Sequence, residues 1–262
     1  MNHFKNIDLI IFAGGHGSRM SEFTTTVPKP LVEVGGMPII WHIMKIYYSF
    51  GVKNFKILLG NKGNLIKKFF LDYNINNSHL SINSSHNTYK IIPNKKKVIE
   101  DWNIELFDTG LESLTAKRLK IVEEYIKNDE FFLTYGDAVS TINIQKLYQN
   151  HVKSEKIITI SAVKSPQRFG KINLQGKKFK FAEKELSNDD LINGGFFVVN
   201  KKIFKMIKGN ISFENGPLRK AFENNDVNIY KHKGFWGCMD TLADKDNLEK
   251  IWKSKNNWIN WK

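Results

Sequence analysis

Phe12-Ala-Gly-Gly-His-Gly-Ser-Arg-Met20, followed by Pro28-Lys-Pro30, is the stretch of sequence that decides the fold. It comes directly after an apolar run at residues 7–12, which predicts a buried first strand. Glycines let backbone N–H groups approach the oxygens of a ligand, and successive N–H groups form an anion-binding nest. Arg19 adds a planar fork of donors and Lys29 adds a point charge. The stretch therefore predicts a strand that ends in a phosphate-binding loop.

Two better-known glycine loops do not fit this stretch. The dinucleotide fingerprint needs a third glycine where Met20 stands, and an acidic residue at the end of a second strand about twenty positions later. A Walker loop needs Gly-Lys-Ser/Thr, which does not occur here. A glycine-rich surface turn is the plain alternative for the loop by itself, and the cations Arg19 and Lys29 weaken that alternative.

Strand-like and helix-like segments alternate along the first half of the chain. This rhythm is typical of a mostly parallel sheet with helices on both faces. Ligands of such sheets lie beyond the carboxyl ends of the strands, where the glycine loop and Asp137 both fall. Residues 74–87, rich in Asn and Ser, predict a loop or a short edge strand. The predicted strands are residues 7–12, 52–59 and 130–135, and the predicted helices are residues 38–50, 64–73 and 118–127.

The second half is predicted to contain more strands. With no repeat or linker to divide it, the chain predicts one domain over residues 1–262, with halves at about 1–150 and 151–262. The fold class is α/β, with a mostly parallel, Rossmann-like mixed sheet flanked by helices and a smaller β-rich part. Further strands are expected at residues 156–163, 171–174, 178–183, 195–199 and 227–232, and further helices at residues 201–208, 216–223 and 243–253.

Composition excludes several classes of protein. No apolar stretch approaches the ~20 residues that cross a bilayer, and the N-terminus lacks the apolar segment of a signal peptide. The single cysteine, Cys238, excludes an internal disulfide and a multi-cysteine metal site. We therefore expect a cytoplasmic protein with no membrane partner.

The net charge of +14 favours anionic ligands such as a nucleoside triphosphate, a sugar phosphate or a nucleic acid. The alternative is a lysine-rich surface with no ligand of its own. Because the lysines are scattered and lack the interleaved aromatic residues of a single-strand binder, we expect no nucleic-acid partner.

The chain resembles the sugar-1-phosphate nucleotidylyltransferases, whose signature is a Gly-Gly-x-Gly-Thr/Ser-Arg loop followed by Pro-Lys-Pro. From about residue 7 onward it is most similar to the glucose-1-phosphate cytidylyltransferase branch. The motifs that carry this second step are Trp41-His-Ile-Met-Lys-Ile-Tyr47, Asp108-Thr-Gly110, Tyr135-Gly-Asp137, Arg168-Phe-Gly170, Ile192-Asn-Gly-Gly-Phe-Phe197 and Gly234-Phe-Trp-Gly-Cys-Met-Asp-Thr-Leu242.

The resemblance implies a nucleotide-diphospho-sugar transferase-like fold and a nucleotidyl transfer. Arg19 and Lys29 match the catalytic cations: Arg19 would hold the leaving pyrophosphate, and Lys29 would bridge the two substrates. Asp137 and Asp240 match the ligands of Mg²⁺, and a helix cap is the alternative role for Asp240. The first half would bind the nucleotide, through Ala13, Gly14, Gly15, Gly17, Ser18, Thr115, Arg118 and Asp137.

Two departures from the family pattern bear on specificity. Ala116-Lys117 replaces a Gly-Gly pair before Arg118, so we expect the local turn and the strictness for CTP to differ. Glu185 replaces a proline after Lys184, which leaves the exact acceptor open. The residues that match the acceptor site in the second half are Arg168, Gly170, Glu183, Lys184, Asn193 and Gly194.

Three functions follow from these residues and the resemblance. The first is a Mg²⁺-dependent cytidylyltransferase that joins CTP to a phosphate ester, with α-D-glucose 1-phosphate as the leading acceptor, for surface polysaccharide precursors. The second is the same transfer with another nucleotide or acceptor, such as another sugar phosphate, a polyol phosphate or an amino phosphate. The third is a nucleotide-phosphate sensor without turnover. The resemblance also implies a homo-oligomer.

Overall fold

The computed structural model describes residues 4–15, 20, 26–97, 99–164, 171–175, 178–182, 191–254 and 258–261. For residues 171–175 and 178–182 it describes the strands and their pairing, and not the side chains.

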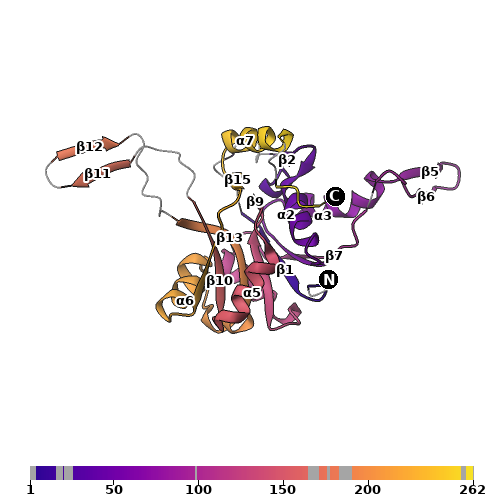
Figure 1. The fold of residues 1–262 in the computed structure, drawn as a ribbon. Helices are drawn as coiled ribbons and strands as arrows, with labels where there is room; N and C mark the ends of the chain where they lie inside the picture. Colours follow the sequence, from indigo (N-terminus) through magenta and orange to yellow (C-terminus); the bar gives the residue numbers. More distant parts are fainter. Residues whose placement is uncertain are drawn as a thin grey trace.

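A seven-stranded sheet forms the centre of the molecule (Figure 1). Its order is β14-β10-β13-β8-β1-β4-β7. All neighbours are parallel except at β13, which is antiparallel to both β8 and β10. The mixed, mostly parallel α/β fold predicted from the sequence is therefore confirmed. The strands are β1 (Asp8–Ala13), β4 (Asn54–Leu59), β7 (Asn103–Asp108), β8 (Glu130–Tyr135), β10 (Ile158–Lys164), β13 (Leu191–Asn200) and β14 (Val227–Lys231).

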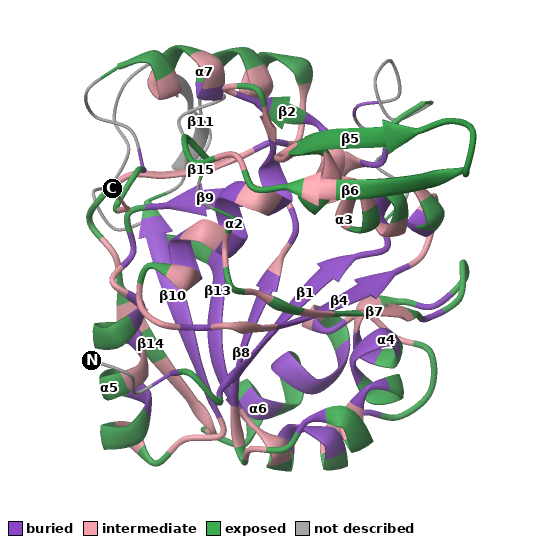
Figure 2. Ribbon diagram, turned by 90° about the vertical axis from the view of Figure 1, so that its right-hand side faces the viewer, coloured by how far each residue is buried: buried purple, intermediate pink, exposed green. Residues whose placement is uncertain are grey.

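Helices cover both faces of this sheet because its strands are apolar on both sides. In β1, Leu9 and Ile11 face one core and Ile10 and Phe12 face the other, as the two-residue period of a strand requires. Figure 2 shows the central strands as buried between layers of helices. Residues of α2 (Ile39–Tyr48), α3 (Gly63–Asn76) and α5 (Ile144–Ser154) belong to the first core, and residues of α4 (Thr115–Ile121) and α6 (Arg219–Glu223) to the second.

The remaining described elements are short. Two-stranded pairs form between β2 (Glu33–Val34) and β3 (Met37–Pro38), β5 (His79–Asn83) and β6 (Thr88–Ile92), β9 (Ala138–Ser140) and β15 (Trp236–Cys238), and β11 (Lys171–Gln175) and β12 (Lys178–Ala182). The single turns are η2 (Lys29–Leu31), η3 (Glu123–Tyr125), η4 (Lys201–Met206) and η5 (Glu214–Leu218), and α7 (Leu242–Lys253) is the last helix.

Several predicted elements differ from the structure in their bounds or type. Residues 74–76 belong to the end of α3, and the short strand predicted within residues 74–87 is β5, which pairs with β6 in a hairpin that projects from the body (Figure 1). The predicted helix at 201–208 is a 3₁₀ turn, and the helix at 118–127 begins earlier, at Thr115. The helix α5 and the strand β7 were not predicted from the sequence.

Both halves of the chain contribute strands to the one central sheet. The first half provides β8, β1, β4 and β7, and the second half provides β14, β10 and β13. The β13–β8 pairing joins the two groups over five registered residue pairs. The single-domain organisation stays a prediction, and this shared sheet supports it.

Candidate active site

A cavity of about 290 Å³ opens at the carboxyl ends of β1 and β8. This is the edge at which ligands of open α/β sheets bind. Its walls include Ala13, Gly15, Lys29, Thr115, Asp137 and Asp240, all of which were predicted to be site residues. Segments that are distant in sequence therefore converge on one cavity.

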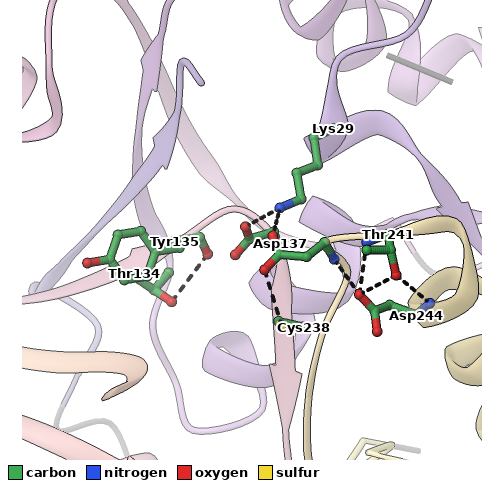
Figure 3. Close-up of polar contacts among 8 residues, drawn as sticks. Lys29, Thr134, Tyr135, Asp137, Cys238, Thr241 and Asp244 are labelled. Atoms are coloured by element: carbon green, nitrogen blue, oxygen red, sulfur yellow. Dashed lines mark hydrogen bonds and ion pairs between the residues drawn. The ribbon is translucent and has the colours of Figure 1, made fainter. Parts of the chain in front are cut away.

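Lys29 is fixed inside the cavity by the Pro-Lys-Pro segment. Pro28 holds an extended conformation, with φ −65° and ψ 146°, and the η2 turn begins directly after it. The Lys29 ammonium lies 2.7 Å from Oδ2 of Asp137 and 2.6 Å from Oδ1 of Asp240. Figure 3 shows the Lys29 side chain reaching Asp137 at this point. One cation thus joins the two carboxylates that the sequence analysis singled out.

A short antiparallel strand pair brings these two aspartates together. In the β9–β15 pair, Ala138 lies opposite Cys238, and the Met239 N–H donates to the Asp137 carbonyl at 2.8 Å. Asp137 precedes β9 and Asp240 follows β15, so both lie at the same end of the pair. The pairing fixes the geometry of the site without any local motif.

Gly136 lets three parts of the site pack closely. Its N–H donates to the Phe12 carbonyl at 3.0 Å, which ties the end of β8 to the end of β1. A Cβ at Gly136 would lie 2.9 Å from that carbonyl and 3.3 Å from Cγ of Pro30. Glycine is therefore needed where the strand end meets the Pro-Lys-Pro turn.

Asp240 is not the N-cap of α7. Thr241 is the cap: its side chain accepts from the Asp244 N–H, while the Asp244 carboxylate accepts from the Thr241 N–H at 2.8 Å. This reciprocal pair is a capping box. The alternative role of Asp240 as a helix cap is therefore wrong, because the cap is the next residue. The Asp240 carboxylate contacts Lys29 instead.

The charge of Lys29 is stable in this setting. Burial by itself would lower the pKa of Lys29, but Asp137 and Asp240 outweigh that effect and raise the pKa above its ordinary value. The side chain is therefore an ammonium at neutral pH.

The two carboxylates also fit a divalent cation. Both face the same point, which the Lys29 ammonium marks. Within the ranges that the structure describes, no group of three or more His, Cys, Asp or Glu residues gathers to hold an ion. Mg²⁺ commonly takes only one or two protein carboxylates together with substrate phosphates and water, so this pair suits it.

The Ala116-Lys117 departure causes no distortion of the backbone. Thr115, Ala116, Lys117 and Arg118 all lie in α4, and none of them has a positive φ. Ala116 is fully buried in the core beneath the sheet, whereas Lys117 is exposed. A helix accepts Ala at least as well as Gly, so the replacement needs no special backbone conformation here, and a difference from the turn of the family stays a prediction.

Arg118 lies behind the wall of the cavity. Its guanidinium donates to three carbonyls at 2.8–3.0 Å, those of Leu59, Gly110 and Gly14. It also donates to Oγ1 of Thr109 at 2.6 Å and to the Leu111 carbonyl at 3.2 Å. Burial lowers the pKa of Arg118, and Asp108 opposes that shift. Contact between Arg118 and a nucleotide stays a prediction.

Part of the predicted acceptor site is described. Asn193 and Gly194 lie at the start of β13, next to the end of β8. The Asn193 carboxamide accepts from the Gly195 N–H at 2.8 Å, and the Gly194 carbonyl accepts from the Trp236 indole at 2.7 Å. The predicted residues that lie outside the described ranges are Gly17, Ser18, Arg19, Arg168, Gly170, Glu183 and Lys184.

Tyr135 lines the cavity, although no role was predicted for it from the sequence. Its hydroxyl donates to the Glu214 carboxylate, and its ring extends away from the Lys29–Asp137 contact (Figure 3). Burial, Glu214 and Asp137 raise the pKa of Tyr135, so the phenol is neutral. Its place two residues before Asp137, at a strand end, could have indicated a cavity position, whereas nothing local links it to Glu214.

The fold and the site define a nucleotidyltransferase. A match to the Nucleotidyl transferase family covers residues 8–236, and the chain belongs to that family. In the part of the chain that the structure describes, no helix is long and apolar enough to span a membrane.

Among curated relatives, the chain is 41% identical over 256 residues to a glucose-1-phosphate cytidylyltransferase of Salmonella typhi, covering 96% of this chain and 98% of the relative. It is 37% identical over 255 residues to a probable glucose-1-phosphate cytidylyltransferase of Bacillus subtilis, covering 96% and 99%. A solved putative glucose-1-phosphate thymidylyltransferase of Bacillus anthracis has the same fold, with a TM-score of 0.67 at 17% identity over 98% of this chain and 97% of that one.

Proposed function

We propose that the protein is a Mg²⁺-dependent cytidylyltransferase that converts CTP and α-D-glucose 1-phosphate into CDP-glucose and pyrophosphate. The observation that carries the proposal is the Lys29 ammonium held between Asp137 and Asp240 at the floor of one cavity. The name of the 41% identical relative from Salmonella typhi supports the choice of CTP and glucose 1-phosphate.

The reaction requires two mutually repelling anions to be held in line. An oxygen of the acceptor phosphate attacks the α-phosphorus of CTP, and the bond from that phosphorus to the oxygen bridging the β-phosphorus breaks. Pyrophosphate leaves with that electron pair. Holding the reactants in the right geometry can supply several kcal/mol of the barrier, and well-oriented intramolecular reactions reach about 7–11 kcal/mol.

Lys29 and the two aspartates supply the electrostatic part. Lys29 is fixed where negative charge increases during the transfer, and a preorganised donor there stabilises the transition state. Asp137 and Asp240 would hold Mg²⁺, which neutralises charge on the phosphate oxygens when it is bound. Arg19 would hold the leaving pyrophosphate.

The two ends of the cavity divide the substrates between them. Because the charged groups lie at Lys29 and Asp137, the phosphates belong there, and the nucleoside extends toward Ala13 and Thr115. The start of the glycine loop (Gly14, Gly15, Gly17 and Ser18) would contact the nucleotide. The acceptor would lie on the β13 side, with Asn193, Gly194, Arg168, Gly170, Glu183 and Lys184.

The replacement of Gly-Gly by Ala116-Lys117 was one reason to expect a nucleotide other than CTP. Because Ala116 fits the helix at Thr115–Ile121, this reason is weaker. Glu185 still leaves the acceptor open, so a different phosphate ester is the alternative within the same chemistry. We further propose that the enzyme acts in the cytoplasm as a homo-oligomer and supplies precursors of surface polysaccharide.

Pyrophosphate release, assayed over four nucleoside triphosphates and a panel of phosphate esters with Mg²⁺, tests the proposal. We expect CTP with glucose 1-phosphate to give the highest kcat/KM. If another nucleotide and phosphate ester give the highest kcat/KM, the substrates differ from those proposed, and the protein is still a nucleotidyltransferase. If no pair yields pyrophosphate while CTP still raises the melting temperature, the protein is a sensor and the proposal fails.

A further inference from the structure

The guanidinium of Arg118 joins the ends of three neighbouring strands. Its acceptors are the Gly14 carbonyl just after β1, the Leu59 carbonyl at the end of β4, and the segment just after β7. β1, β4 and β7 are adjacent and parallel in the sheet, so their carboxyl ends meet at one edge. Arg118 thus binds together the edge at which the nucleoside end of the cavity is built.

Several hydrogen bonds hold the segment after β7, at residues 109–111. Nη1 of Arg118 donates to the Thr109 hydroxyl, and that hydroxyl donates onward to the Leu59 carbonyl at 2.6 Å. Nη2 donates to the Leu111 carbonyl and Nη1 to the Gly110 carbonyl. A planar guanidinium presents five N–H donors in a fixed fork, and no lysine could reach so many oxygens at once.

The Arg118 guanidinium fills the space beside Gly14 and Gly60. A Cβ at Gly14 would lie 2.5 Å from Cζ of Arg118, and a Cβ at Gly60 would lie 2.6 Å from both Nη1 and Nη2. Gly60 directly follows β4 and does not line the cavity, whereas Gly14 lies between two residues that do. The guanidinium therefore packs directly against both glycines, and a Cβ at Gly60 would also lie 2.6 Å from the Gly14 carbonyl.

Arg118 is also turned away from the ligand. It is only 4% exposed and is not among the residues that line the cavity, although Thr115, one helical turn earlier, is. Both Nη atoms of the guanidinium already donate to protein oxygens. A phosphate contact would require these bonds to break and a charge to move out of its buried position.

We propose that Arg118 is a positioning residue that fixes Gly14, between the cavity-lining residues Ala13 and Gly15, by tying it to Leu59 and to the segment at residues 109–111, and that it does not touch the triphosphate. This inference rests on the nucleotide-binding role proposed above. In this proposal Arg118 maintains the shape of the site, and the phosphates are bound near Lys29.

Binding measurements on Arg118→Lys test the inference, with Lys117→Ala as the matched control on the exposed neighbour. Dissociation constants are measured by calorimetry for cytidine, CMP and CTP. Because several charge-assisted hydrogen bonds are lost, we expect all three ligands to weaken by a similar factor of about ten or more. Lys117→Ala should change none of them by more than about twofold, as expected of an exposed side chain.

A phosphate contact would give a different pattern. The positive charge of Lys would retain much of the CTP affinity, and any loss would grow from cytidine to CTP. That pattern, or an Arg118→Lys variant that binds all three ligands like the parent, overturns the inference.

Thr109→Val provides a second test if Arg118→Lys does not fold. Valine has the shape of threonine but no hydroxyl, so one acceptor of Nη1 is lost and the segment at residues 109–111 is partly released. We expect a smaller uniform loss of affinity, of about threefold to tenfold, and a raised KM for CTP with an unchanged KM for the acceptor. A purely structural role would instead lower the urea midpoint and leave the ratio of the two KM values unchanged, which overturns the inference.

Failure of the proposed function gives a separate result. If the parent binds a different nucleotide, the same nucleoside-to-triphosphate series is measured for that nucleotide, and a uniform loss still supports the role of Arg118. If the parent binds no nucleotide at all, both proposals are wrong.

Discussion

Two cations near the cavity, Lys29 inside it and Arg118 behind its wall, are held in opposite ways. Lys29 lies inside it, with its side chain 16% exposed, between two carboxylates. Arg118 is buried behind the wall and donates to neutral carbonyl and hydroxyl oxygens. Both are the basic residues of family motifs, so charge by itself does not mark a reacting group. The partners of the cation and its place relative to the cavity decide its role.

The largest effect is expected at the reacting end, from Lys29→Ala. Removal of one preorganised donor costs about 10²–10³-fold in kcat, and here it also removes the ammonium that lies between Asp137 and Asp240. We expect a loss of about 10³-fold in kcat. Steady-state pyrophosphate release measures it. Activity within a fewfold of the parent would show that the reacting centre lies elsewhere.

The next largest effect is expected from Asp240→Asn, with Thr241→Ala as its matched neighbour. We expect Asp240→Asn to lower kcat by about 10²-fold, as a lost electrostatic contact does, with little change in melting temperature. Thr241→Ala should lower the free energy of unfolding by about 1 kcal/mol, because it removes the α7 cap, and leave activity less affected. The reverse pattern would assign the structural role to Asp240.

His42, outside the cavity, tests stability rather than catalysis. It is fully buried, its Nε2 lies 2.7 Å from the Val34 carbonyl, and burial lowers its pKa to about 4 despite the opposing charge of Glu249. Between pH 6.5 and about 4 the unfolded chain takes up a proton that the folded chain does not. The free energy of unfolding should therefore fall as pH falls, by on the order of 3 kcal/mol over that window.

Urea unfolding of the parent and of His42→Gln at pH 7, 6 and 5 measures this effect. The difference between the two proteins isolates His42 from the other histidines. We expect the slope with pH to be smaller in the variant. Equal slopes would mean that His42 gains a proton in the folded protein as readily as in the unfolded chain.

The smallest effect is expected from Ala116→Gly, at the nucleoside wall. Restoring the glycine of the family pattern adds flexibility inside α4, so the free energy of unfolding should fall by about 1 kcal/mol. The KM for CTP should stay within about twofold of the parent, because Ala116 is buried beneath the sheet and does not line the cavity. A large gain in CTP affinity would show that the replacement had weakened the site.

Three of the four parallel strands of the first half, β1, β4 and β8, were predicted from the sequence because their signals are local. The apolar run before the glycine loop predicted β1, and the strand at residues 130–135 has the predicted bounds. The meeting of Asp137 and Asp240 was expected from the family pattern alone. It depends on the pairing of β9 with β15, two strands of three residues each that are too short to show a period.

The helix α5 was missed although it carries a local signal: Asn143 caps it, and its buried residues Ile144, Leu147 and His151 have the spacing of a helix face. Other features could not be predicted, because they join positions that are distant in the sequence. The bond from Tyr135 to Glu214 joins residues 79 positions apart, so no spacing rule can find it. The five bonds of Arg118 likewise depend on three strands coming together.

The contact between Lys29 and Asp240 joins positions 211 residues apart in the chain. No fragment or half-folded intermediate that lacks either end of that span can assemble the charged centre. A ligand that binds only the assembled centre stabilises only molecules that have finished folding. Bound nucleotide should thus raise the resistance of the complete folded chain to proteolysis, and give no such protection to a chain truncated before Asp240.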